Sequence, residues 1–316
     1  MRFGARTCVG MLREQNQDSF LTLEVQVGTK RDEVSEETPE MVSYGLYVVA
    51  DGMGGAAAGD KASADALEVI LGTLIRTMGR THVARKTRLR ETPQHLAEAI
   101  RRANEEIYRA GEEDSSLEGM GTTITAAAAH DGILHIAQVG DSRLYRLREG
   151  EFVQLTTDHS VVQEMVDAGR ITKERARTHP LKNQITRAVG PEPECEVDVA
   201  HDVLQEGDLY LLCSDGLWEM VTDDEIEEMV KGSLSNSETA GNLDLLCEAL
   251  VAKACDAGGR DNVTVMLLET EAEDVRANAA TEMLMAAPTK LDRPKAPLGR
   301  LDRTLTHPRT SVFIKD

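Results

Sequence analysis

Aromatic residues are scarce in this chain of 316 residues, because Phe, Trp and Tyr together make up 3% of it. A hydrophobic core must therefore be built from Val, Leu, Ile, Ala and Met. No apolar run approaches the roughly 18 residues that a membrane-spanning helix needs, and residues 1–10 lack the apolar segment of a signal peptide. We therefore expect a cytoplasmic protein that does not contact a membrane.

Cysteine is also sparse, with five widely spaced residues and no Cys-x-x-Cys pair. This spacing excludes a disulfide framework and a zinc knuckle, and it predicts reduced thiols. No cysteine is followed by arginine six positions later, which excludes the cysteine-based phosphatase mechanism. The eight histidines show no His-Glu-x-x-His spacing. The cysteines are Cys8, Cys195, Cys213, Cys247 and Cys255.

Basic residues are in deficit, with 35 Lys and Arg against 55 Asp and Glu and a net charge of −20. Such a surface repels phosphate backbones and anionic lipid, so we expect no nucleic-acid or membrane partner. A small anionic substrate is still allowed, because a bound metal can invert the local field.

Short strand-like runs of Val, Ile, Leu and Tyr, bounded by Gly, Asp or Asn, dominate the chain. Asp131-Gly132 and Glu149-Gly150 each join two of them as hairpin turns. Consecutive hairpins predict antiparallel sheet, because parallel pairing needs long crossovers. The predicted strands are Leu21–Val27, Tyr44–Ala50, Thr122–Ala129, Ile133–Val139, Arg143–Leu147, Asp208–Cys213 and Asn262–Leu268.

Apolar residues at helical spacing predict helices within Ala62–Ile75, Leu96–Ile107 and Leu243–Val251, with a basic loop at Arg80–Pro93. Because strands and helices come in groups, an α+β layered sandwich is favoured. We expect one domain over residues 1–270. Residues 271–316 hold four of the nine prolines and show no period, so they are predicted to be a disordered tail.

Five aspartates fall at the ends of predicted strands: Asp18, Asp51, Asp141, Asp215 and Asp261. In an antiparallel sheet the end of one strand and the start of its neighbour share an edge, so these acids could converge. Bare carboxylates in contact repel one another, and a divalent cation removes that penalty. Oxygen ligands suit Mg²⁺ or Mn²⁺ better than zinc.

A single Asp-Gly after a strand is most often a plain turn, so the argument rests on the set. Two ions about 3.5–4 Å apart would hold a bridging water and aim it at phosphorus. Gly52 and Gly216 let the backbone come close to such a site, where a carbonyl can add a ligand. The motifs Arg-x-x-Asn-x-Asp, Asp-Gly-x-Gly-Gly, Gly-Asp-Ser-Arg, Ser-Asp-Gly and Gly-x-Asp-Asn occur in this order.

Over about residues 3–270 the chain resembles the metal-dependent serine/threonine protein phosphatases of the protein phosphatase 2C type. Met53 stands where eukaryotic relatives often place histidine, so the resemblance is to the bacterial branch. It implies a four-layer α/β/β/α sandwich with two central antiparallel β-sheets flanked by helices. The blocks that carry it are Arg13–Ser19, Val48–Gly55, Gly119–Thr123, Val139–Arg143, Leu212–Leu217 and Gly258–Thr264.

The resemblance implies a metal centre built from five of these positions. Asp51 would bridge two Mn²⁺ or Mg²⁺ ions, with the Gly52 carbonyl on one of them. Asp215 and Asp261 would complete the other ion. Asp141, together with Asp215, matches the acids that hold a third ion in bacterial members.

The resemblance also implies roles around the metals. Asp18 would orient a water, and Thr122 and Asn262 would support the site. Arg13 would clamp the substrate phosphate, and the planar guanidinium suits two phosphate oxygens. The implied reaction is hydrolysis of phosphoserine and phosphothreonine by direct attack of the bridging water, without a covalent intermediate.

Two positions depart from the family pattern. Position 17 is Gln where many relatives carry Glu, so a contact from there to a metal-bound water would be neutral and weaker. Met53 replaces the histidine thought to act as general acid, which leaves the leaving-group acid open. The segment at about 156–190 matches the flap of bacterial members, with Ser160 as a helix N-cap. Within it, His159 is either a proton donor or a local residue at the helix start.

The implied partners are phosphoproteins, including a Ser/Thr kinase whose targets or activation loop the enzyme resets, and we expect a monomer. Two alternatives stay open. A fold that has lost its chemistry could serve as a phosphoprotein-binding module, although Asp51, Asp215 and Asp261 are intact. An active enzyme could also use its tail to contact a signalling partner.

Overall fold

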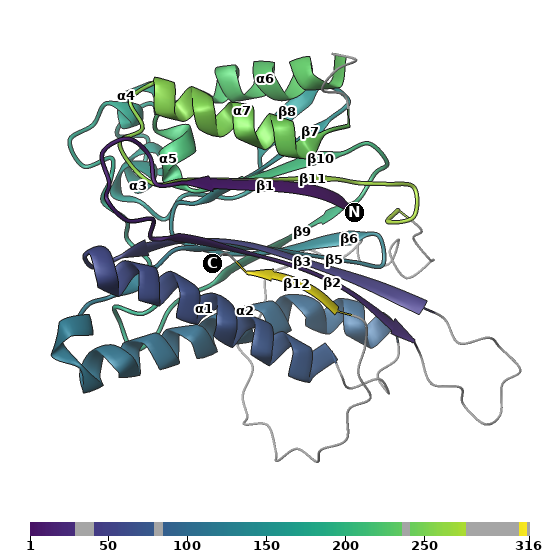
Figure 1. The fold of residues 1–316 in the computed structure, drawn as a ribbon, viewed down its shortest axis with the longest axis horizontal. Helices are drawn as coiled ribbons and strands as arrows, with labels where there is room; N and C mark the ends of the chain where they lie inside the picture. The colour runs from purple at the N-terminus through teal and green to yellow at the C-terminus, as the bar shows by residue number, and fades with distance from the viewer. Residues whose placement is uncertain (29–40, 79–84, 236–240, 276–309, 315–316) are drawn as a thin grey trace, which may run out of the picture.

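Two antiparallel sheets lie face to face between two layers of helices in the computed structural model, which describes residues 1–28, 41–78, 85–235, 241–275 and 310–314 (Figure 1). The first sheet has the strand order β1 (Arg2–Cys8), β11 (Val263–Glu269), β10 (Leu209–Cys213), β7 (Arg143–Arg148) and β8 (Glu151–Gln154). The second has the order β12 (Thr310–Ile314), β2 (Asp18–Gly28), β3 (Met41–Met53), β5 (Ile124–His130), β6 (Ile133–Val139) and β9 (Asp198–Val203). A short strand, β4 (Gly121–Thr122), pairs with the end of β3.

The helices form the two outer layers (Figure 1). Helices α1 (Ala56–Met78) and α2 (Arg85–Glu113) cover the second sheet, and α6 (Asp223–Ser235) and α7 (Leu243–Asp256) cover the first. The predicted four-layer sandwich is therefore confirmed. The short helices are η1 (Ser115–Leu117), α3 (Val161–Asp167), α4 (Lys173–Arg177) and α5 (Asp215–Trp218).

The interior strands β5 and β6 are buried on both faces, because each face of their sheet is covered. In β5 the side chains of Ala126 and Ala128 join the core beneath α1 and α2. The alternate residues Ala127 and Ala129 join the core between the two sheets. This alternation follows from the two-residue period of a strand. It explains why β5 and β6 are mostly apolar and are buried throughout.

Both predicted hairpins are confirmed. The turn between β5 and β6 places Asp131 at φ 51° and Gly132 at φ 78°. The turn between β7 and β8 places Glu149 at φ 50° and Gly150 at φ 82°. Two successive residues with positive φ match the right-handed twist of the strands that they join.

The prediction of a loop at Arg80–Pro93 is wrong for the part of it that the structure describes, from Arg85 onward. Residues 79–84 lie outside the described residues, but α2 begins at Arg85 and contains Pro93. Proline removes one backbone donor from a helix, and here it does not end the helix. No helix in the described segments has the length and apolarity to cross a bilayer.

The predicted tail over 271–316 falls mainly on residues 276–309 and 315–316, which lie outside the described residues. Thr310–Ile314 differs from the prediction, since it forms β12 and pairs antiparallel with Leu21–Val25 of β2. The edge strand β2 offers unpaired backbone groups that accept a further strand.

Candidate functional site

The five predicted aspartates lie at the same end of the two sheets. Asp18 begins β2 and stands opposite Asp51, near the end of β3, in the antiparallel register. Asp215 begins α5 directly after β10, and Asp261 lies just before β11. Asp51, Asp141, Asp215 and Asp261 line one cleft of about 610 Å³. The expected convergence therefore holds for these four carboxylates, while Asp18 is fully buried behind them.

Asp18 is held by donors from the opposite sheet. Its Oδ2 accepts hydrogen bonds from Ser214 Oγ and Thr264 Oγ1, each at 2.7 Å. Ser214 follows β10 and Thr264 lies in β11, whereas Asp18 belongs to the second sheet. This carboxylate therefore joins the two sheets at the site.

Asp51 is fixed through its main chain. Its carbonyl accepts from Thr122 Oγ1 at 2.9 Å and from the Thr123 amide at 2.8 Å. Its own amide donates to Thr123 Oγ1 at 3.1 Å. The two threonines hold the strand end in place, so the Asp51 carboxylate is left to face the cleft.

Asn262 holds the loop that carries Arg13. Its Oδ1 accepts from the Gln17 amide at 2.8 Å, and its Nδ2 donates to the carbonyls of Val9 and Gln15 at 2.9 Å. The loop between β1 and β2 crosses from one sheet to the other at the left of Figure 1. Asn262 therefore supports both Asp261, its neighbour, and the loop with Arg13.

Arg13 pairs with one of the predicted metal ligands. Its Nη2 donates to Asp261 Oδ2 at 2.6 Å, and half of its side chain is exposed. The hydrogen bond to Asp261 raises the pKa of Arg13 above its ordinary value. Arg13 also lines the cleft, so its guanidinium can reach an anion there.

The cleft concentrates negative charge. Burial raises the pKa of Asp51 well above its ordinary value, and repulsion from Asp18 adds to the shift. Burial and the neighbouring Asp141 do the same to Asp215. Burial, followed by repulsion from Asp158, raises the pKa of Asp141 to about 7. A cation in the cleft would relieve this repulsion.

The donor set fits a hard divalent cation. Asp215 Oδ1 is buried and has no hydrogen-bond partner among the described residues. Carboxylate and carbonyl oxygens are the ligands that Mg²⁺ and Mn²⁺ prefer. Within the described part of the chain, no three His, Cys, Asp or Glu side chains are already drawn together around one ion position.

Two glycines allow the backbone to pack closely at the site. A Cβ on Gly52 would lie 2.0 Å from the Gly59 carbonyl oxygen, and one on Gly216 would lie 1.9 Å from the Asn262 carbonyl oxygen. Both obstacles are backbone atoms, which cannot rotate away. The expectation that these positions need glycine is therefore supported by close approach.

Gly216→Ala is expected to lower the free energy of unfolding by about 2 kcal/mol or more, as overpacking of a tight contact does. The measurement is the thermal unfolding midpoint, followed by circular dichroism. Gly232→Ala in α6 is the control, because a Cβ there meets nothing within 4 Å. We expect that control to gain about 0.5–1 kcal/mol from the better helix former. Equal midpoints for the two variants would contradict the steric argument.

Gln17 and Met53, the two positions at which the resemblance led us to expect other residues, both lie at the cleft. Gln17 Nε2 donates to the Gly55 carbonyl at 2.8 Å, a bond that a glutamate could not donate. Met53 lines the cleft. The predicted N-cap is confirmed, because Ser160 Oγ accepts from the Gln163 amide at the start of α3.

His159 fits its local, structural alternative. Its Nδ1 accepts from the Gly140 amide at 3.1 Å, which leaves Nε2 to donate to Asp198 Oδ2 at 3.1 Å. The ring is buried and is not among the residues that line the cleft. Both ring nitrogens are therefore engaged, one by the Gly140 amide and the other by Asp198.

Sequence reasoning missed three hydroxyl residues: Thr123, Ser214 and Thr264. Each lies next to or near a residue that was singled out, inside the Gly-Met-Gly-Thr-Thr, Ser-Asp-Gly and Asp-Asn-Val-Thr blocks. A hydroxyl beside a strand-end aspartate was therefore an available signal. What it could not reveal is that Ser214 and Thr264 bind the Asp18 carboxylate, whereas Thr123 accepts from the Asp51 amide.

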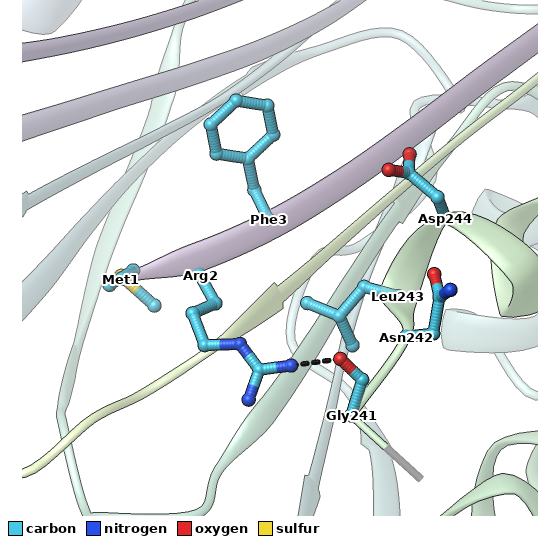
Figure 2. Close-up of a pocket in the computed structure, with 7 residues that line it drawn as sticks. All are labelled: Met1, Arg2, Phe3, Gly241, Asn242, Leu243 and Asp244. Carbon is cyan, nitrogen blue, oxygen red and sulfur yellow. Dashed lines mark hydrogen bonds between the residues drawn. The ribbon is translucent and has the colours of Figure 1, made fainter. Parts of the chain in front are cut away.

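Figure 2 shows a second pocket, formed by the start of β1 and the residues that lead into α7. Arg2 reaches across it and donates to the Gly241 carbonyl. Of the residues that line it, Asp244 is the one acid, and none of the predicted site residues is among them. We therefore place the functional site at the aspartate-lined cleft.

The sequence also matches the model of a known protein family. Residues 30–251 match the family model described as Protein phosphatase 2C. The chain belongs to the protein phosphatase 2C family.

Proteins named as serine/threonine phosphatases are similar to this chain in sequence and in fold. The chain is 40% identical over 226 residues to the serine/threonine phosphatase stp of Listeria monocytogenes serotype 4b (strain F2365). The aligned region covers 72% of this chain and 84% of that protein. Its fold is similar to the crystal structure of the Mycobacterium tuberculosis serine/threonine phosphatase PstP/Ppp, with a TM-score of 0.68 and 33% identity over 85% of this chain and 98% of that one.

A further structure bears on the cofactor. The catalytic domain of the serine/threonine protein phosphatase PstP in complex with two manganese ions matches with a TM-score of 0.64 and 33% identity. The match covers 85% of this chain and 98% of that chain.

Proposed function

We propose that this protein is a metal-dependent protein serine/threonine phosphatase, which hydrolyses phosphoserine and phosphothreonine in other proteins. Family membership and the named relatives support the class of reaction. The observation that carries the proposal is the convergence of Asp51, Asp141, Asp215 and Asp261 with Arg13 on a single cleft.

The acids of the cleft would hold Mn²⁺ or Mg²⁺. Asp51 and the carbonyl of Gly52 would serve one ion, with Asp51 shared by a second ion that Asp215 and Asp261 complete. Asp141, with Asp215, would hold a third. When bound, such ions supply a water activated near neutral pH for attack on phosphorus. The manganese-bound PstP domain supports this choice of metal.

The chain's own residues position the reaction. Asp18 has one carboxylate oxygen fixed by Ser214 and Thr264, so the group is held in one orientation from which it can receive a proton from water. Arg13 would exchange Asp261, which would then serve as a metal ligand, for two phosphate oxygens. The planar fork of arginine fixes the phosphorus for in-line attack.

The partner, oligomeric state, location and domain bounds of the enzyme are also proposed. The natural counterpart would be a Ser/Thr kinase, whose targets or activation loop this phosphatase resets. We propose a monomer in the cytoplasm, a catalytic domain over 1–270 and a flap over about 156–190. The flap residues Asn183 and Ile185 line the cleft, which supports a role beside the substrate.

Turnover of p-nitrophenyl phosphate and of a phosphothreonine peptide tests the proposal. We expect hydrolysis with Mn²⁺ and none with excess EDTA, because the acids alone cannot activate water. Circular dichroism would control for folding in both conditions. If folded protein that binds Mn²⁺ turns over neither ester, catalysis is excluded and the phosphoprotein-binding alternative takes its place.

A further inference from the structure

Two cysteines far apart in the sequence meet beside the site. Cys8 is the last residue of β1, and Cys255 lies in the last turn of α7. Their sulfur atoms are 3.9 Å apart. Both residues are partly exposed, unlike the buried Cys213 and Cys247, so a small oxidant can reach them.

Each thiol stands just before a segment that carries a site residue. Cys8 leads into the loop with Arg13, and its sulfur accepts from the Gly10 amide at 3.4 Å. Cys255 leads into the turn that ends at Asp261. The two sulfur atoms therefore lie where β1 and α7 end and the two segments begin.

The two segments are already tied to each other. The Met11 amide donates to the Gly259 carbonyl at 2.7 Å. A Cβ on Gly10 would lie 2.2 Å from the Asp261 carbonyl oxygen, so the backbones touch. Arg13 and Asp261 then close the contact by their ion pair at 2.6 Å. Movement of the cysteines is thus transmitted to both site residues.

We propose that Cys8 and Cys255 form a disulfide when the protein meets a peroxide, and that this cross-link lowers phosphatase turnover. The effect on turnover rests on the proposed function. A disulfide brings the sulfurs to about 2.05 Å, so the ends of β1 and α7 must draw together or the side chains must rotate. Either change fixes the Arg13 loop against the Asp261 segment. Arg13 is then hindered from leaving Asp261 for a phosphate.

The chemistry balances with one hydrogen peroxide per disulfide. One thiolate attacks a peroxide oxygen, the O–O bond breaks, and a sulfenic acid and water form. The second thiolate attacks that sulfur, the S–O bond breaks, and a second water leaves. Two electrons pass from the two thiols to the peroxide, and dithiothreitol reverses the change.

The rate should depend on pH. Burial and the adjacent Cys8 sulfur raise the pKa of Cys255 above its ordinary value. Because the thiolate is the reactive form, the disulfide should form faster as pH rises.

The test uses the full chain, oxidised with hydrogen peroxide in EDTA, cleared with catalase and then assayed with Mn²⁺. We expect a peptide that links Cys8 to Cys255 by mass spectrometry. Turnover of p-nitrophenyl phosphate should fall about tenfold, since a displacement of about 1 Å can cost up to a hundredfold. Dithiothreitol should restore it. Cys8→Ser and Cys255→Ser should resist peroxide, whereas Cys195→Ser, at the third partly exposed cysteine, should stay sensitive.

The outcomes separate the two proposals. Absence of the linked peptide overturns the disulfide, whatever happens to activity. A linked peptide with unchanged turnover overturns the inhibitory effect. If the reduced protein has no turnover at all, the proposed function fails, while the linked peptide still decides whether the thiols pair.

Discussion

Asp215→Asn is expected to lower kcat/KM for p-nitrophenyl phosphate with Mn²⁺ by about a thousandfold or more, equivalent to about 4 kcal/mol of transition-state stabilisation. Asp215 starts α5 inside the cleft, and its buried Oδ1 has no hydrogen-bond partner among the described residues. In the proposed function this oxygen would bind a metal, and an amide cannot supply the charge. Steady-state kinetics measure the loss.

The same variant should be more stable without metal. Burial and neighbouring acids raise the pKa of Asp215. An acid whose pKa is raised on folding costs stability as pH rises, because the folded state keeps a proton that the unfolded state has released. The cost begins near the ordinary Asp value of about 4 and grows up to the raised value. In EDTA at pH 7, Asp215→Asn should therefore unfold at a higher temperature than the wild type, with a gap that shrinks toward pH 4.

Manganese should reverse that order. A ligand that binds only the folded state at a hundred times its Kd adds about 2.7 kcal/mol, so Mn²⁺ should raise the wild-type midpoint and leave the variant nearly unchanged. Asp65→Asn is the matched control, because Asp65 pairs with Lys61 on α1. A variant that keeps both turnover and the manganese shift would show that Asp215 is not a ligand.

Arg13→Ala is expected to lower kcat/KM for phosphothreonine peptides by about 10- to 100-fold, the range of a charge-assisted hydrogen bond worth about 1.5–3 kcal/mol. Arg13 reaches into the cleft from a loop that Asn262 holds in place. Arg13→Lys should recover only part of the loss, because a point charge cannot bind two phosphate oxygens in one plane.

The metal response should distinguish Arg13 from Asp215. Arg13 occupies Asp261 Oδ2, so its removal frees a ligand, and Mn²⁺ should stabilise Arg13→Ala at least as well as the wild type. Arg6→Ala is the control, since Arg6 is an exposed arginine of β1 that pairs with Asp244. If Arg13→Ala keeps full kcat/KM, the phosphate does not depend on this side chain.

The interior strands could be predicted because they are apolar on both faces. Ile133–Val139 was predicted with its observed bounds, and Leu209–Cys213 to within one residue. The strands that were missed, β1, β9 and β12, lie at sheet edges, and β1 and β9 carry polar residues such as Arg6 and Asp202. Burial along β1 and β9 is mixed, so their apolar period is weak. Helix α6 was also missed.

The site residues could be placed from the sequence because strand ends are marked by the chain itself. The contacts between these site residues could not be predicted from the sequence. Whether Ser214 and Thr264 reach Asp18 depends on β10 and β11 being neighbours in one sheet that faces β2 in the other. Likewise, Arg13 and Asp261 are 248 residues apart, and no local sequence pattern predicts their contact.

The pairing of β1 with β11 also bears on how the protein is synthesised. Arg2 pairs with Glu269 and Cys8 with Val263, so β1 cannot pair until β11, far later in the chain, has been translated. Asp261 and Thr264, which belong to the proposed site, are translated just before that pairing can complete. A nascent chain therefore has no complete site until its first sheet can close. Translation that stops before β11 would leave a fragment without the proposed site.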